Sequence, residues 1–203
     1  MTDPVWDRLD AAWTPARQAG VLGSASVEEL RRHAAGYVPA ACGVLGHGID
    51  LGSGAGVPGV ILALLHPAST WHLVDASERR CSLLRRVVHE MELDERVIVH
   101  HARAEDLGHD ATYRDFADLV VARLLGPVAE TVEVAVPLLD ADGVAVISVD
   151  DASANRASAA SVAGLSLQVR SEDVGAYLEV RRTGDVPASW PRRTSTRRRA
   201  PLF

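Results

Sequence analysis

Short apolar runs alternate with longer helical patterns along the middle of the chain. The runs have the length of buried strands, at residues 48–51, 71–75, 97–101, 118–122 and 143–149. Because strands that alternate with helices form parallel sheets covered by those helices, the pattern predicts an α/β fold.

The helical patterns lie between these runs. Residues 58–65 and 127–139 carry such patterns, and Ser77 is the expected N-cap of another helix. The apolar face of that helix consists of Cys81, Leu84, Val88 and Met91. Residues 152–163 are rich in alanine and serine, and they fit either a helix or a mobile connector.

The front of the chain is helical and stands apart from the alternation. Val5, Leu9 and Trp13 recur at helical spacing, and Ser26 with Glu29 forms a capping box that opens a second short helix. The expected organisation is an N-terminal helical segment at 1–36, a core at 37–183 and a basic tail at 184–203.

Two further strand-like runs follow the fifth predicted strand. Residues 165–169 and 177–181 alternate apolar and polar positions around Ser171-Glu172-Asp173, which predicts a terminal antiparallel hairpin. The whole pattern predicts a Rossmann-like, seven-stranded, mostly parallel sheet with this hairpin at one side and helices on both faces.

Composition narrows the class of protein. The 203 residues are 47% apolar and 24% charged, which is ordinary for one folded domain. The longest nearly apolar stretch, 57–65, is much shorter than the roughly 20 residues of a membrane span, so no membrane partner is expected. The start shows no secretory signal pattern. Cys42 and Cys81 lack paired spacing, which favours buried thiols in a reducing cytoplasm.

Charge is distributed unevenly. The net charge is −6, and all 21 basic residues are arginines. From Arg181 onward seven arginines and the single acid Asp185 give +6, whereas the first 180 residues carry −12. A basic tail suits the phosphates of a nucleic acid, and a solvated, frayed terminus is the other interpretation. The candidate RNA contacts are Arg192, Arg193, Arg197, Arg198 and Arg199.

A glycine-rich turn follows the first predicted strand. It reads Asp50-Leu51-Gly52-Ser53-Gly54-Ala55-Gly56-Val57-Pro58-Gly59. Glycines let the chain turn sharply and expose backbone N–H groups to a ligand. The glycine spacing also fits a dinucleotide fingerprint. However, Asp50 would repel a pyrophosphate, whereas it suits the ammonium and sulfonium groups of S-adenosylmethionine.

Two acids follow at the ends of the next predicted strands. Asp75 ends the second strand, where a carboxylate accepts both hydroxyls of a ribose, and Glu105 follows the third, within reach of an adenine edge. Each acid alone is equally an ordinary helix-cap or surface residue. Together with the turn they predict a site for S-adenosylmethionine, and a dehydrogenase that binds NAD is the rival enzyme. The eight histidines show no metal-ligand spacing, so no metal is expected.

Segments beyond the glycine turn also follow a recognisable pattern. They are Leu73-Val74-Asp75, Arg79-Arg80, Leu84 to Glu90, His101 to Glu105, Ala122-Arg123, Trp190 to Arg193, Arg197 to Arg199 and Pro201-Leu202. With the turn, they resemble the RsmG (GidB) family, which methylates guanine N7 in bacterial small-subunit (16S) ribosomal RNA. The resemblance runs from about Val27 to Leu202.

The resemblance implies a cofactor, a partner and several contact residues. The cofactor is S-adenosylmethionine and the partner is ribosomal RNA or the small ribosomal subunit. The implied cofactor contacts are Gly52, Val57, Ala104, Glu105 and Arg123. The turn and the second strand add Asp50, Gly54, Gly56 and Asp75. Arg123 ends the fourth strand, where the transferred methyl group should lie, so we expect it to orient substrate or cofactor.

The expected chemistry needs alignment more than a base. Guanine N7 has a free lone pair and no proton to remove before attack. After the fourth strand the chain reads Ala122-Arg123-Leu124-Leu125, unlike the Asn- or Asp-Pro-Pro-aromatic turn of amino-group DNA methyltransferases. Neither cysteine is placed for covalent attack on a pyrimidine. We therefore expect a direct, metal-free transfer.

Three segments depart from the family pattern. Leu22-Gly23-Ser24-Ala25 stands in place of Asn-Leu-Thr, Ala34-Ala35-Gly36 in place of Asp-Ser, and Val149-Asp150-Asp151 in place of Lys-Gly. Two acids in a cleft meant for phosphates are unfavourable. Two alternatives therefore stay open: a small-molecule methyltransferase on the same scaffold, and a non-catalytic module that binds the cofactor.

Overall fold

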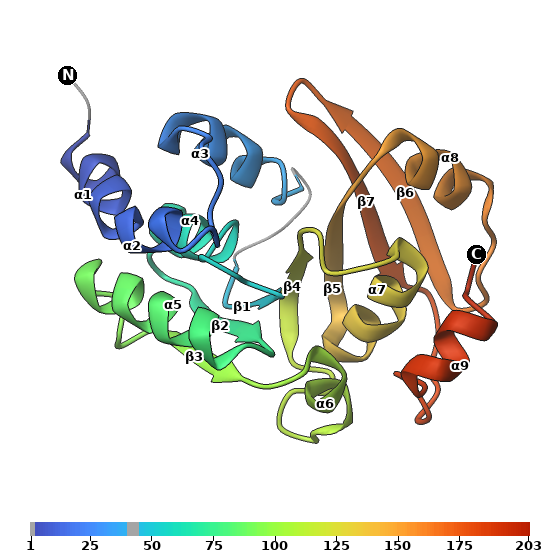
Figure 1. Ribbon diagram of the computed structural model, residues 1–203. Helices are drawn as coiled ribbons and strands as arrows, with labels where there is room; N and C mark the ends of the chain where they lie inside the picture. Colours follow the sequence, from blue (N-terminus) through green and yellow to red (C-terminus); the bar gives the residue numbers. More distant parts are fainter. Residues whose placement is uncertain (1–2, 40–44) are drawn as a thin grey trace.

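One sheet of seven strands organises the molecule (Figure 1). The computed structural model describes residues 3–39 and 45–203. The strand order is β3-β2-β1-β4-β5-β7-β6; the first five strands in sequence run parallel, and β7 is antiparallel to both its neighbours. The strands are β1 (His47–Leu51), β2 (Thr70–Asp75), β3 (Val97–His101), β4 (Ala117–Ala122), β5 (Leu139–Val149), β6 (Leu165–Glu172) and β7 (Gly175–Arg182). The expected fold, with its terminal hairpin, is confirmed.

Helices cover both faces of this sheet. Alternate residues of a strand point to opposite faces, so on β4 Leu119 and Val121 join one buried cluster while Val120 and Ala122 join the other. The first cluster is covered by α1 (Pro4–Ala12), α2 (Thr14–Gln18), α3 (Val27–Ala35), α4 (Gly59–Leu65) and α5 (Glu78–Glu90). The second is covered mainly by α6 (Ala104–His109), α7 (Val128–Ala135) and α8 (Asp151–Ala159).

The helices at the front of the chain belong to the main core. Leu9, Trp13 and Leu30 are buried in the cluster that covers the first face of the sheet. The Trp13 indole also donates a hydrogen bond to the Ala55 carbonyl at 2.7 Å. The front helices are therefore fastened directly to the glycine-rich turn.

Some boundaries differ from those that the pattern predicts. The helix expected over 127–139 ends at Ala135, a 3₁₀ turn (η1, Val136–Leu138) follows, and β5 begins at Leu139 rather than 143. Pro137 lacks the backbone N–H that a continuing helix requires. The segment left open at 152–163 contains helix α8, because Asp150 caps its first turn by accepting from Ser153 N at 2.7 Å.

The tail also folds. A short helix, α9 (Thr194–Arg199), forms within it and lies beside α7 (Figure 1). Cys81 is buried and unpaired, as expected. Cys42 lies outside the described residues.

Candidate functional site

The glycine-rich turn sits at the carboxyl end of β1. Gly52, Gly54 and Gly56 all have positive φ angles, of 73°, 57° and 92°, a region that other residues rarely adopt. The backbone N–H groups of Gly52 and Ser53 donate to the Val74 carbonyl at 2.8 and 3.0 Å. The turn is therefore held against the neighbouring strand β2.

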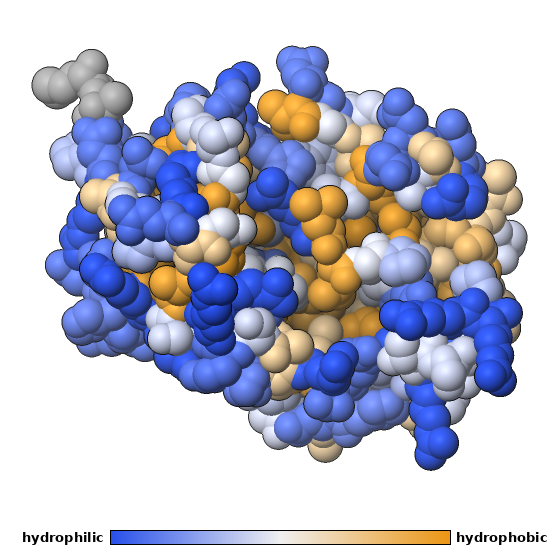
Figure 2. Space-filling view, in the orientation of Figure 1, coloured by the Kyte–Doolittle hydropathy of each residue, from blue (hydrophilic) through white to orange (hydrophobic). Residues whose placement is uncertain are grey.

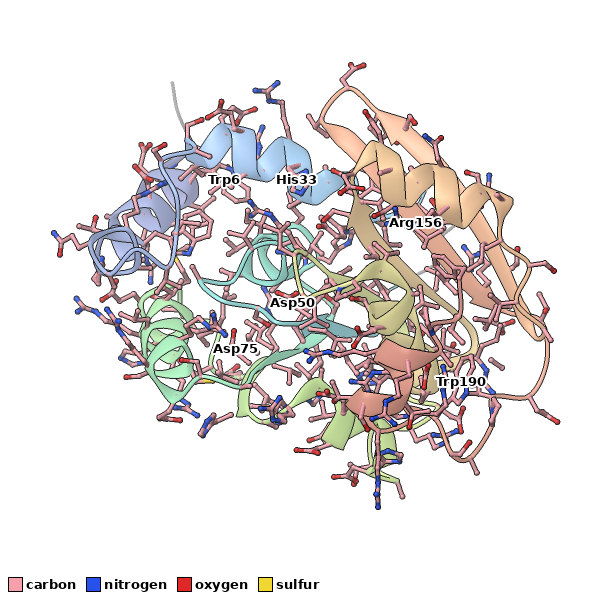
Figure 3. All side chains as sticks on the ribbon, turned by 45° about the vertical axis from the view of Figure 1, so that its right-hand side comes forward. Trp6, His33, Asp50, Asp75, Arg156 and Trp190 are labelled. Carbon is pink, nitrogen blue, oxygen red and sulfur yellow. The ribbon has the colours of Figure 1, made fainter. Side chains whose placement is uncertain are left out.

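Asp50 lies beneath this turn, deep in the molecule (Figure 3). Its Oδ2 accepts from the Gly59 N–H at 3.0 Å, while the buried Oδ1 has no hydrogen-bond partner within the described residues. Burial raises the pKa of Asp50 to about 7, and the Gly59 N–H opposes that rise. Asp50 thus ties the turn to helix α4 and retains one unsatisfied acceptor.

A first cavity of about 340 Å³ opens beside the turn, and we call it the cofactor cavity. Gly52, Asp75, Ala104 and Glu105 line it, as the sequence predicts for a ligand site. The Asp75 carboxylate is buried and accepts from the backbone N–H groups of Gly54 at 3.1 Å and Ser77 at 2.8 Å. Arg80 Nε also donates to it, at 2.9 Å.

These residues suit S-adenosylmethionine. A Cβ added at Gly54 would meet nothing closer than 3.9 Å, so the backbone there leaves room for a ligand. Asp75 and Glu105 present carboxylate oxygens that match ribose hydroxyls and the adenine amino group. Asp50 itself is buried beneath the turn and lines none of the described cavities, so its unsatisfied Oδ1 lies behind the cavity surface. Cavities of this size are typical of small-molecule sites.

Five predicted cofactor residues lie outside the cofactor cavity. Gly54 lines a separate cavity and Arg123 lines the larger cavity described below, whereas Asp50, like Gly56 and Val57, lines none of the described cavities. Gly56 and Val57 are packed into the core. A Cβ added at Gly56 would overlap Val60 and lie 2.9 Å from Leu84 Cδ1. Gly56 therefore serves the packing of the turn against helices α4 and α5.

A second, larger cavity of about 740 Å³ lies between α3, α7, α8 and the hairpin, and we call it the acceptor cleft. Figure 2 shows a hollow with an apolar floor and a hydrophilic rim in this region. Arg32, Arg123 and Arg156 line the cleft. The described residues give Arg32 and Arg123 no hydrogen bond or ion pair, and Arg156 bonds only the Ser153 hydroxyl.

The two cavities meet at one loop. Leu125, Gly126, Pro127 and Thr131 line both of them. In the same loop Leu124 has a positive φ of 55° and is 87% exposed. A branched apolar residue in that conformation is strained, and such strain concentrates at functional loops.

His33 is a cleft residue that the sequence analysis did not single out as part of the site. The Tyr177 hydroxyl donates to the His33 carbonyl at 2.8 Å and lies 2.9 Å from its Nδ1. Burial, and secondly the charge of Arg123, lower the pKa of His33, so its ring is neutral at pH 7. A Cβ at Gly36 would meet the Tyr177 ring, so the altered Ala34–Gly36 segment makes room for this contact.

The arginines of the tail divide into two groups. Arg192 donates from Nε to Glu133 Oε1 at 2.8 Å, and Arg197 donates from Nη2 to Glu105 Oε1 at 2.7 Å. The other three, Arg193, Arg198 and Arg199, are exposed.

Residues 3–39 and 45–203 contain neither a membrane-spanning helix nor a cluster of metal ligands. No helix there is both long and apolar enough to span a membrane. Within the same ranges, no group of three or more histidine, cysteine, aspartate or glutamate side chains is arranged to hold a metal ion.

Solved structures share the fold. A methyltransferase from Geobacter sulfurreducens superposes with a TM-score of 0.63 at 16% sequence identity, covering 90% of each chain.

Sequence relatives identify the family. The model of GidB, rRNA small subunit methyltransferase G, matches residues 38–181. Ribosomal RNA small subunit methyltransferase G of Desulfitobacterium hafniense is 32% identical over 75% of this chain and 68% of its own length. The protein of that name in Deinococcus radiodurans is 32% identical over 76% of this chain and 65% of its own. Some other relatives align over only 39% to 40% of their length. Family and fold imply S-adenosylmethionine as the cofactor, and the chain belongs to the GidB family of methyltransferases.

Proposed function

We propose that this protein transfers the methyl group of S-adenosylmethionine to guanine N7 of small-subunit ribosomal RNA. The observation that carries the proposal is that the cofactor cavity and the acceptor cleft adjoin at one loop and share the lining residues Leu125, Gly126 and Pro127. The substrate class comes from the name of the relatives, and the N7 atom from the resemblance to the family. The substrate would place its action in the cytoplasm.

The charges of the acceptor cleft support an RNA substrate. Arg32, Arg123 and Arg156 offer cations to phosphates. The two acids of the cleft are engaged in helix caps. Glu29 accepts from the Ser26 backbone N–H at 2.8 Å, and Asp150 accepts from Ser153 N. The departure at Val149-Asp150-Asp151 therefore leaves Asp150 engaged at the start of α8.

The residues of the chain would act by orientation. A bound cofactor would supply an electrophilic methyl group with S-adenosylhomocysteine as the leaving group. Because the N7 lone pair needs no deprotonation, the chain would not have to provide a base. Arg123 follows β4 and lines the acceptor cleft next to the loop shared with the cofactor cavity, so we assign it the orientation of substrate or cofactor. Because the Tyr177 hydroxyl engages Nδ1 of the neutral His33 ring, at most one ring nitrogen is left to contact the acceptor base.

The test is transfer of labelled methyl from S-adenosylmethionine to small-subunit ribosomal RNA that lacks the modification, offered naked and as assembled subunits. We expect label in 7-methylguanine at one position. An Arg123→Ala variant should lose at least ten-fold in rate, whereas Arg86→Ala, an exposed arginine on α5, should match the parent. Normal turnover by Arg123→Ala would remove its assigned role.

Other results would overturn the proposal itself. Label in small acceptors but not in RNA would point to a small-molecule methyltransferase. Cofactor binding without transfer to any acceptor would point to a non-catalytic module.

A further inference from the structure

The tail forms part of the cofactor cavity. Thr194, Arg197 and Arg198 line that cavity together with Asp75 and Glu105. Arg197 is only 3% exposed, although it lies in a run of arginines that otherwise faces solvent. Such burial of a guanidinium requires paired acids, and it indicates a role inside the molecule.

Several contacts fasten the tail in the segment just before Arg197. The backbone N–H and Nε of Arg192 donate to Glu133 Oε1 at 2.7 and 2.8 Å, and Glu133 is fully buried on α7. Arg114 donates to the Trp190 carbonyl at 2.9 Å, and His109 Nε2 lies 2.9 Å from the Pro191 carbonyl. Figure 3 shows Trp190 on this side of the molecule. These anchors hold the tail between α7 and the segment around α6.

Arg197 itself controls the carboxylate of Glu105. Its Nη2 lies 2.7 Å from Glu105 Oε1 and 3.2 Å from the Thr194 hydroxyl. Burial alone would raise the pKa of Glu105, but the hydrogen bonds from its own backbone and from Arg197 outweigh burial and lower it. Arg197 Nε is buried with no hydrogen-bond partner within the described residues, 3.9 Å from Glu130 Oε2.

We propose that residues 190–199 are the wall of the cofactor cavity and that Arg197 is a positioning residue. It would hold Glu105 ionised and aimed at the adenosine part of the cofactor. The cavity of about 340 Å³ exists with the tail docked, so the tail is a wall and not a plug. The inference rests on the cofactor and not on the identity of the methyl acceptor.

A wall of this kind couples two equilibria. If the cofactor binds only the chain with a docked tail, docking of the tail favours cofactor binding by a certain free energy. Bound cofactor then stabilises the docked tail by the same free energy. The exposed Arg193 and Arg199 would then be held in place most firmly when the methyl donor is loaded.

The first test is calorimetric binding of S-adenosylhomocysteine, which needs no turnover. Arg197→Ala should weaken binding at least ten-fold, and Arg197→Lys should restore part of the loss. Arg86→Ala, a change at an exposed arginine on α5 that lines none of the described cavities, is the control, and its affinity should stay within two-fold of the parent. Parent-like binding by a folded Arg197→Ala chain, checked by circular dichroism, would overturn the inference.

The second test measures hydrogen exchange of the tail in the protein without substitutions. In hydrogen exchange, S-adenosylhomocysteine should slow exchange of the amides of residues 194–199, since docking and binding are coupled. Unchanged exchange there, with slowed exchange at the glycine turn, would also overturn the inference. These readouts are independent of RNA: expected results here with no RNA methylation would remove the proposed substrate and leave the wall in place.

Discussion

At the scale of single residues, the glycines of one turn perform different tasks. Gly54 borders a cavity and has open space where a side chain would stand, whereas Gly56 is packed against Val60 and Leu84. Both have positive φ angles, so both resist substitution for a backbone reason as well. The roles of Gly54 and Gly56 can be distinguished by the atoms that an added methyl group would contact.

Gly54→Ala and Gly56→Ala are therefore expected to fail in different ways. Gly54→Ala should cost about 1–2 kcal/mol of unfolding free energy from its backbone conformation alone and weaken S-adenosylhomocysteine binding at least ten-fold. Gly56→Ala should cost more stability, because the methyl also overlaps side chains. Urea unfolding with calorimetry measures both, and equal stability losses would contradict this assignment.

Asp75 gives a second prediction at this scale. Asp75→Asn removes the negative charge and one acceptor from a carboxylate that takes hydrogen bonds from Gly54, Ser77 and Arg80. We expect at least ten-fold weaker binding of S-adenosylhomocysteine in calorimetry. Asp110→Asn changes an exposed loop cap in the same way and is the control. Parent-like affinity of Asp75→Asn would show that this carboxylate does not hold the cofactor.

The sequence predicts those site residues that follow strand ends. Gly52, Asp75 and Glu105 line the cofactor cavity because successive parallel strands end at the same edge. The sequence could not predict the pairing of Arg192 and Arg197, because their acids lie 59 and 92 positions away. Glu133, an acid between Val132 and Val134 on a largely apolar helix, was the available signal that a cation must come from elsewhere.

At the scale of elements, periodicity locates strands and helices, while local chemistry sets their ends. The sequence identifies the five parallel strands and the hairpin because their apolar runs are short and bounded. It misses the early start of β5, which follows from Pro137 stopping the helix. Helix α9 carries no apolar face, so only its docking against α7 reveals it.

A histidine pair between neighbouring strands predicts a pH dependence. His72 on β2 stacks on His100 on β3, with Nδ1 and Nε2 2.8 Å apart. Burial first, and then the charges of His100 and His47, lower the pKa of His72 from 6.5 to about 4. Between about pH 4 and pH 6.5, His72 is therefore protonated in the unfolded chain and neutral in the folded chain. Stability from this group is complete above about pH 6.5 and falls as the pH drops toward 4.

Urea unfolding at pH 7 and pH 5 measures this effect. When the pH is lowered from 7 to 5, the unfolding free energy of the parent should fall by about 2 kcal/mol more than that of His72→Gln, because the glutamine does not titrate. His89→Gln, a change at an exposed histidine, should behave like the parent. A His72→Gln chain as pH-sensitive as the parent would exclude His72 as the source.

At the scale of the whole molecule, two cavities and two kinds of arginine are combined. The acceptor cleft carries Arg32, Arg123 and Arg156, while the tail presents Arg193 and Arg199 to solvent beside the cofactor cavity. The first 180 residues are acidic overall, so the net charge of the protein would not attract RNA. The attraction would come from these local groups of arginines. This arrangement makes the contribution of the tail measurable through salt.

The slope of log affinity for RNA against log salt concentration reports the number of phosphate contacts. Replacing Arg193 and Arg199 together by alanine should reduce the slope of log affinity against log salt by about 0.7–0.9 per lost contact. Arg86→Ala, a change at an exposed arginine that lines neither cavity, should leave the slope unchanged. Equal slopes for all three proteins would mean that the exposed tail arginines touch no phosphate.

The position of the cavity wall near the end of the chain also bears on translation. Every strand of the sheet, and the glycine turn, leave the ribosome before Trp190, at about 5–20 residues per second. For that interval a nascent chain holds its sheet without a complete place for the methyl donor. A product terminated before Trp190 is therefore expected not to bind S-adenosylmethionine. Only chains translated past Arg197 would be able to bind the methyl donor.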